Sequence, residues 1–207
     1  MDKEAAVQYV IKNNIDGVFI ECGVGDGQFE RIWINELKIH NTVRDIYMYD
    51  TFSGLTIPGK YDYTCANASW NMNNDEVLKT WEKQIIDQKV NGWCYTPLEK
   101  VKESLEMTGY PSNKLHYIVG DVLETLQNPE NIPDKIAILR LDTDWYESSK
   151  FELEKLYPNV VKGGVVIFDD YLHWDGQRRA TDEYFANIGE SHNFVKINDT
   201  VAAMIKN

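Results

Sequence analysis

The sequence has few cysteines, a shortage of basic residues and no long apolar run, and each shortage excludes a class of protein. Its three cysteines are odd in number and lack the spacing of metal or redox motifs, which favours a reducing, cytoplasmic location. A net charge of −12 argues against nucleic acid or an anionic membrane surface as a partner. No stretch approaches the roughly 18 apolar residues of a membrane span, and the polar N-terminus predicts no signal peptide.

The length of 207 residues suits a single domain, 1–207, in which short β-rich runs alternate with segments of helical periodicity. The expected strands lie at about 17–22, 45–49, 115–119, 136–141 and 164–168. The expected helices lie at about 2–13, 27–39, 75–90, 97–108, 147–157 and 177–187. This alternation predicts an α/β fold with a doubly wound, mostly parallel sheet. The segment after residue 192 predicts a hairpin around Asn198, so the last strand should run antiparallel.

A glycine-rich turn separates the first expected strand from the helix that follows. It comprises Glu21, Cys22, Gly23, Val24, Gly25, Asp26, Gly27 and Gln28. Glycines at such a junction let the backbone approach a ligand and leave the N–H groups of the helix free to bind it. The dinucleotide motif G-x-G-x-x-G does not match, because Gln28 stands where its last glycine would be. Glu21 suits a ligand with a cationic amino-acid end, and a turn without a ligand is the alternative.

Two further strand ends predict contacts to a nucleoside. Asp50 ends the second strand, before Thr51, Phe52 and Ser53, where a carboxylate can accept hydrogen bonds from both ribose hydroxyls. Its alternative role is to cap the turn that follows. The third strand ends in Gly120, Asp121 and Val122, where an adenine ring would lie. Asp121 could equally be the N-cap of a helix at 122–127.

Paired acids follow the last two parallel strands. Asp142 ends the strand at 136–141, with Asp144 two residues on, and Asp169 and Asp170 end the strand at 164–168. Neighbouring strands lie about 4.8 Å apart, so Asp142, Asp169 and Asp170 can converge. Their mutual repulsion would be relieved by Mg²⁺, Ca²⁺ or Mn²⁺, which prefer carboxylate oxygens. Helix caps and salt bridges with Arg140, Arg178 or Arg179 are the alternative.

Several segments of the chain resemble the macrocin O-methyltransferase family. They are "DTFSGL", "VGDVLETL", "ILRLDTDWYESSKFELEKLYPNVVKGGVVIFDDYLHW" and "GQRRATDEYF", and the likeness runs from about residue 17 to 187. The resemblance implies a class I methyltransferase fold and transfer of a methyl group from S-adenosylmethionine to a sugar hydroxyl, with Mg²⁺ or Mn²⁺. It implies metal ligands at Asp142, Asp169 and Asp170, a cofactor loop at Glu21 and Gly23 to Gly27, and a ribose contact at Asp50. The acceptor would be a sugar nucleotide, a glycan or a glycosylated small molecule of polysaccharide or secondary-metabolite synthesis.

The methyl transfer that the resemblance implies needs a base. A sugar hydroxyl must lose its proton as it attacks the methyl group, and Asp142, Asp144 and His173 are the candidate bases. His173 and Trp174 could instead contact the acceptor or simply pack. Two departures from the family concern the active-site cover and the acceptor pocket: only about sixteen residues precede the first strand, and Leu172 stands where a glycine is common.

A polar, aromatic segment at about 56–96 predicts a lid-like insertion over the site. It carries Tyr61, Tyr63, Trp70 and Trp81, whose rings could stack on a sugar, and ordinary packing of an inserted helix is the alternative. A homo-oligomer is possible. Two other functions stay open at this point: a nicotinamide-dependent oxidoreductase and a non-catalytic scaffold that binds the cofactor.

Overall fold

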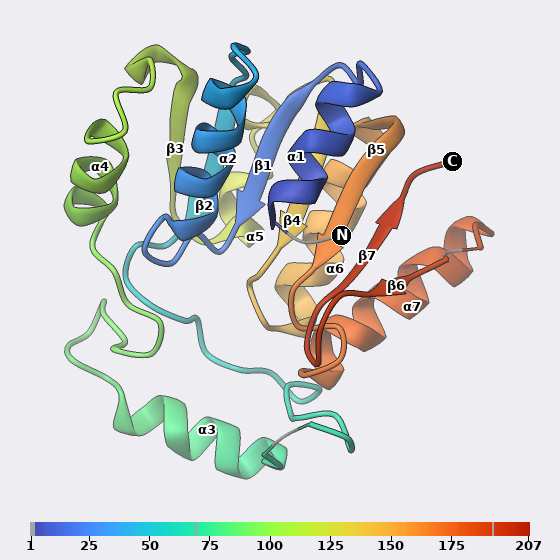
Figure 1. The fold of residues 1–207 in the computed structure, drawn as a ribbon. Helices are drawn as coiled ribbons and strands as arrows, with labels where there is room; N and C mark the ends of the chain where they lie inside the picture. The colour runs from blue at the N-terminus through green and yellow to red at the C-terminus, as the bar shows by residue number, and fades with distance from the viewer. Residues whose placement is uncertain (1–2, 69, 192) are drawn as a thin grey trace.

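The computed structural model describes residues 3–68, 70–191 and 193–207, which form a seven-stranded sheet in the order β3-β2-β1-β4-β5-β7-β6 (Figure 1). Its strands are β1 (Val18–Cys22), β2 (Ile46–Asp50), β3 (Leu115–Val119), β4 (Ile136–Leu141), β5 (Val160–Phe168), β6 (Val195–Lys196) and β7 (Ala202–Ile205). The first five strands pair in parallel, and β7 runs antiparallel to both β5 and β6. The predicted doubly wound sheet with an antiparallel C-terminal hairpin is confirmed.

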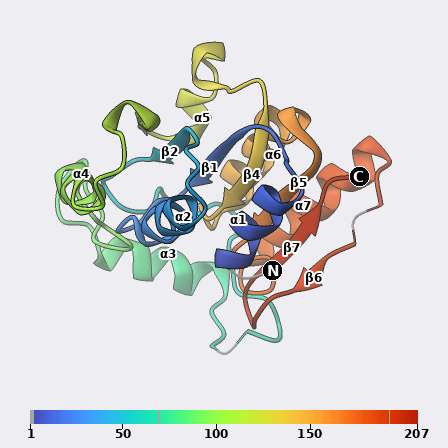
Figure 2. The same cartoon turned by 45° about the horizontal axis from the view of Figure 1, so that its top comes forward.

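Helices cover both faces of the sheet (Figure 2). One face carries α1 (Lys3–Lys12), α2 (Gln28–Ile39) and α4 (Leu98–Glu106), and the other carries α5 (Val122–Thr125), α6 (Tyr146–Leu156) and α7 (Asp175–Ile188). Short 3-10 turns lie at Ser112–Lys114, Pro129–Asn131 and Tyr157–Asn159. Each face buries its own apolar cluster, as the unbroken apolar strands require. No described helix has both the length and the apolar character that a membrane crossing needs.

Two predicted boundaries are wrong. The helix expected at 75–90 is α3 (Asn74–Lys83), which stops seven residues early. Beyond it, the Asp87 side chain accepts hydrogen bonds from the amides of Lys89 (2.7 Å) and Val90 (3.0 Å), which closes a turn in place of further helix. Strand β5 begins at Val160, four residues before the expected start, because Gly163 at φ 82° lets the strand bend and continue. Residue 2, where the first expected helix begins, lies outside the described residues.

The segment between β2 and α4 runs across the carboxyl ends of the strands, with α3 below them in Figure 1. Backbone hydrogen bonds tie it to the start of α7: Cys65 N–H donates to His173 O (2.7 Å), and Asp175 N–H donates to Tyr63 O (2.8 Å). A small apolar cluster around Trp145 and Trp174 fills the space between. The insertion is therefore packed against the same end of the sheet at which the predicted site residues lie.

Candidate active site at the carboxyl ends of the strands

A cavity opens where the glycine turn, the ends of β2, β3 and β4, and the insertion meet. Of the predicted site residues it is lined by Gly23, Gly25, Asp50, Thr51, Gly120, Asp121, Val122, Asp142 and Asp144. The sequence did not indicate its other lining residues: Tyr49, Gly54, Leu55, Thr56, Cys94, Thr143 and Ser148. Residues such as Leu55 and Cys94 reach the cavity only because the insertion folds back, and no local pattern announces that contact.

The three glycines of the turn have different tasks. A Cβ on Gly23, at φ 85°, would lie 1.9 Å from the backbone oxygen of Asp142, so the turn packs directly on the end of β4. Gly27, at φ 78°, is the N-cap of α2. A Cβ on Gly25 would meet nothing within 4 Å, although Gly25 lines the cavity. The open backbone at Gly25 is the part of the turn that leaves room for a ligand.

Asp50 organises this turn from the neighbouring strand. Its Oδ2 accepts hydrogen bonds from the amides of Val24 (2.7 Å) and Gly25 (3.3 Å), and its Oδ1 accepts one from the amide of Phe52 (2.6 Å). Burial raises the pKa of Asp50, and these amide contacts oppose that rise. The capping role is therefore present, and a ribose contact stays a prediction. Phe52 does not line the cavity, and Ser53 faces a neighbouring hollow beside α3.

Asp121 caps a helix and also lines the cavity, and its contact to an adenine ring stays a prediction. Its Oδ1 accepts a hydrogen bond from the amide of Leu123 (2.9 Å), which makes it the N-cap of α5. The same residue lines the cavity between Gly120 and Val122. The helix it caps is shorter than the expected 122–127, because it ends at Thr125.

Arg140 is the central cation of the site. It is buried at 3% exposure and pairs with Glu21, with Asp142 (Nη1 to Oδ2, 2.8 Å) and with Asp169 (Nη2 to Oδ1, 2.6 Å). Glu21 therefore lies behind the cavity, against Arg140, and together with Val24 and Asp26 it faces a second hollow. Burial raises the pKa of Glu21. A charged residue within "IAILRL" was the sequence signal for this network, since a buried guanidinium needs carboxylate partners.

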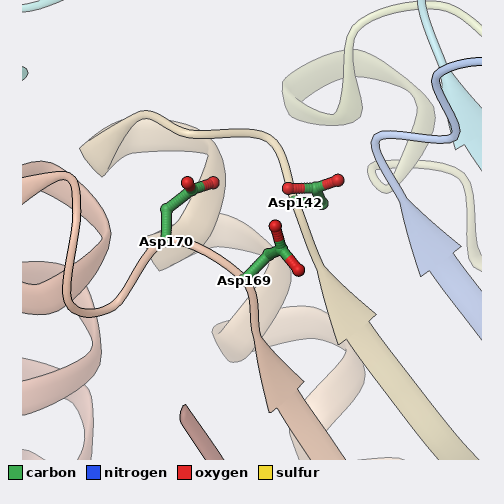
Figure 3. Close-up of side chains that lie close together, drawn as sticks. All are labelled: Asp142, Asp169 and Asp170. Atoms are coloured by element: carbon green, nitrogen blue, oxygen red, sulfur yellow. The ribbon is translucent and has the colours of Figure 1, made fainter. Parts of the chain in front are cut away.

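Asp142, Asp169 and Asp170 converge as predicted (Figure 3). One carboxylate oxygen from each lies within 4.8 Å of the others. The Oδ2 atom of Asp170 is buried and receives no hydrogen bond from the described residues. Burial raises the pKa of both Asp142 and Asp170; the charge of Arg140 opposes this rise, and the charges of neighbouring carboxylates add to it. All three donors are carboxylate oxygens, and Arg140 is their single counter-charge. Such a set fits a divalent cation of the Mg²⁺ type.

The alternative explanation, that arginines neutralise these acids through salt bridges, applies to Arg140. Arg140 contacts two of the three carboxylates, but each of those two has a second oxygen on which Arg140 makes no contact. Arg178 pairs with Asp175, and Arg179 pairs with Glu183 (3.2 Å). One guanidinium cannot neutralise three carboxylates when all of them are ionised.

Asp144 and His173 occupy different surroundings. Asp144 adopts φ 65°, lines the cavity beside Asp142 and accepts a hydrogen bond from Trp174 Nε1 (2.7 Å). Burial raises the pKa of Asp144. His173 does not line the cavity; its ring packs against Trp70 (4.9 Å between centroids) and Trp174 (4.8 Å), and burial lowers its pKa. Of the three candidate bases, Asp142 and Asp144 thus line the cavity and His173 does not.

Comparison with known proteins agrees with this architecture. A family model described as macrocin-O-methyltransferase (TylF) matches residues 1–206. The 8-demethyl-8-(2,3-dimethoxy-alpha-L-rhamnosyl)-tetracenomycin-C 4'-O-methyltransferase of Streptomyces olivaceus is 29% identical over 94% of this chain and 67% of its own length. The demethyldecarbamoylnovobiocin O-methyltransferase of Streptomyces niveus is 29% identical over 92% of this chain and 66% of its own. The chain spans about two thirds of these relatives.

The solved structure of the O-methyltransferase NovP has the same fold, with a TM-score of 0.81 and 24% identity over 99% of this chain and 77% of that one. The predicted class I methyltransferase fold is confirmed. The family match also decides the enzyme class in favour of a methyltransferase, over an oxidoreductase or a non-catalytic scaffold. The chain belongs to the macrocin O-methyltransferase family.

Proposed function

We propose that this protein transfers a methyl group from S-adenosylmethionine to a sugar hydroxyl, with Mg²⁺ or Mn²⁺ bound by Asp142, Asp169 and Asp170. The observation that carries the proposal is the position of Asp142, which lines the cavity and also belongs to the carboxylate cluster. A cofactor in the cavity and a cation on the cluster would therefore share an edge, as transfer of a methyl group to a cation-bound acceptor requires.

The cavity supplies contacts for each part of the cofactor. Gly25 gives open backbone, while Asp50 and Asp121 offer carboxylates to the nucleoside. Because Glu21 is held by Arg140 outside the cavity, Asp142 takes over the expected role of facing the cationic amino-acid end. Glu21 then acts indirectly, by fixing the guanidinium that orients Asp142. When bound, S-adenosylmethionine supplies the electrophilic methyl group.

The carboxylate cluster supplies the cation site. Arg140 occupies Asp142 Oδ2 and Asp169 Oδ1, which leaves the other oxygen of each residue and the unpartnered Asp170 Oδ2. When bound, a divalent cation stabilises the negative charge that develops on the acceptor oxygen. Arg140 also holds Asp142 and Asp169 in place, so that little side-chain order remains to be gained on binding.

We assign the proton-accepting role to Asp144 in preference to Asp142 and His173. Asp142 already contacts Arg140 and is a proposed ligand, and His173 is packed between two indole rings outside the cavity. Asp144 faces the cavity, and burial raises its pKa, which makes the carboxylate a stronger base.

The acceptor would enter beneath the insertion. Its residues Leu55, Thr56 and Cys94 line the cavity, and Tyr61 and Trp70 present aromatic rings nearby. The names of the two curated relatives favour a sugar attached to a secondary metabolite. The three free cysteines support a reducing, cytoplasmic setting.

Transfer of labelled methyl groups to a panel of glycosides and sugar nucleotides tests the proposal. Activity should disappear in EDTA and return with Mg²⁺ or Mn²⁺, while calorimetric titration should show S-adenosylhomocysteine binding in both conditions and no binding of NAD. Full turnover after verified removal of metal would contradict the cation. Absence of S-adenosylhomocysteine binding would contradict the cofactor assignment.

A further inference from the structure

Asp144 has an uncommon backbone conformation. It lies at φ 65°, in the left-handed region that non-glycine residues visit rarely and aspartate tolerates better than most. It belongs to the loop between β4 and α6, and its carboxylate faces the cavity. A group that must meet an acceptor hydroxyl within hydrogen-bond reach needs a fixed direction, so something outside this loop has to supply it.

Trp174 supplies that contact from the other end of the site. Its Nε1–H donates to Asp144 Oδ1 at 2.7 Å, a short, charge-assisted hydrogen bond when the carboxylate is ionised. Trp174 is itself only 3% exposed. Its backbone N–H donates to Asp170 O (2.8 Å), which ties the indole to the segment that carries two of the proposed cation ligands.

The indole of Trp174 is held rigid by three other tryptophans, which with it form the tryptophan cluster. The ring centroids of Trp145, Trp70 and Trp93 lie 5.2, 5.6 and 6.3 Å from that of Trp174. Trp70 and Trp93 belong to the insertion, and Thr64 bridges to Trp174 through the backbone. The insertion is thereby connected, through one indole N–H, to the carboxylate of Asp144.

We infer that Trp174 is a positioning residue, which directs the Asp144 carboxylate toward the acceptor and is itself braced by the insertion through the tryptophan cluster. The inference rests on the proposed function, in which Asp144 accepts the proton. It gives the insertion a role in turnover besides covering the site.

The test compares Trp174→Phe with the matched control Trp33→Phe. Both variants replace a buried indole by a smaller aromatic ring, but only the first removes a hydrogen bond to a carboxylate, since Trp33 lies on α2 outside the tryptophan cluster. Trp174→Phe should lower kcat about 10–100-fold while KM for S-adenosylmethionine changes less than about threefold, because a misdirected base slows the chemical step. Trp33→Phe should keep kcat within about threefold. Equal kcat in the two variants would overturn the inference.

A double-mutant cycle separates positioning from packing. Asp144→Gly removes the carboxylate while tolerating φ 65°. In that background, Trp174→Phe should lower kcat no further, since there is no carboxylate left to direct. A full additional loss would show that the indole acts only through packing and would overturn the inference.

A spectroscopic measurement decides the contact without relying on turnover. In ¹⁵N-indole spectra, the Trp174 N–H resonance should move upfield and exchange faster in Asp144→Gly, while the Trp93 resonance stays in place. An unchanged Trp174 resonance would show that the hydrogen bond is absent and overturn the inference. Failure of the wild-type protein to transfer any methyl group would instead count against the proposed function.

Discussion

The acids at the ends of β2 and β3 are neutralised differently from those at the ends of β4 and β5. Asp50 and Asp121 accept hydrogen bonds from backbone amides, so each helps to shape a loop. Asp142 and Asp169 share the guanidinium of Arg140, and one buried oxygen of Asp170 has no hydrogen-bond donor among the described residues. The first arrangement needs no cation, whereas the second, when its carboxylates are ionised, has more negative charge than Arg140 neutralises, and a bound cation would balance it.

Removing Arg140 should have the largest effect, because it is the counter-charge of the acids at the ends of β4 and β5. Arg140→Met leaves Glu21, Asp142 and Asp169 without their counter-charge, so the free energy of unfolding should fall by roughly 5 kcal/mol, the upper end for loss of one partner of a buried pair. Urea unfolding at pH 7 measures this. Lys135→Met, which breaks an exposed pair with Asp16, should lower the free energy of unfolding far less, because solvent screens that pair. Equal losses would show that Arg140 is not the counter-charge of the site.

Glu152, on α6, is a further buried acid next to the cavity, because it contacts the cavity residue Thr143. It is fully buried and accepts a hydrogen bond from Thr143 (2.9 Å), and burial raises its pKa to about 8. Between pH 4.5 and 8 the folded protein therefore holds a proton that the unfolded chain has lost, so this group makes stability fall as pH rises.

Glu152→Gln removes that dependence while keeping the size of the side chain. Relative to the wild type, the variant should gain roughly 4 kcal/mol between pH 4.5 and pH 8.5. Melting temperatures of both proteins across this range provide the measurement. Parallel pH profiles would mean that Glu152 ionises at its ordinary pKa in the folded state.

Asp170→Asn tests whether turnover depends on the negative charge of this carboxylate. Loss of a cation ligand should lower kcat at least about 100-fold, or ~2.7 kcal/mol, as removal of groups that support a bound metal commonly does. Stability in EDTA should stay constant or rise, because repulsion from Asp142 and Asp169 is relieved. Asp134→Asn, an exposed acid at the opposite end of β4, is the matched control and should leave both quantities unchanged. Loss of stability without loss of turnover would return Asp170 to a structural role.

Asp50→Asn tests the acids at the ends of β2 and β3, and its expected effect is the smallest of these predictions. An amide keeps one acceptor oxygen, so either the hydrogen bonds from Val24 and Gly25 or the one from Phe52 are lost, and S-adenosylhomocysteine should bind about 1–2 kcal/mol more weakly. Calorimetric titration measures the affinity, with Lys135→Met as a remote control. Unchanged affinity would confine Asp50 to capping its own turn.

Patterns along the chain determined most of the fold. Apolar runs such as "IAILRL" and "GVVIF" can be buried only as central strands, and the glycines at 23, 25 and 27 require a tight turn before a helix. The convergence of Asp142 with Asp169 and Asp170 also followed from the sequence, because parallel neighbours place their carboxyl ends together. The helix beyond Lys83 was predicted wrongly because its apolar residues do not reveal that the Asp87 side chain closes a turn.

What only the tertiary structure decided is which partner each acid meets. Glu21 was expected to face the cofactor, yet Arg140, 119 residues away in the chain, draws it behind the cavity. Trp174 reaches Asp144 across 30 residues, and Leu55 and Cys94 enter the cavity from the insertion. A hydrogen bond or ion pair depends on distances of a few ångströms, and such distances between remote residues exist only after the chain has packed. Residue spacing predicts the faces and ends of the elements, and packing chooses the contacts between them.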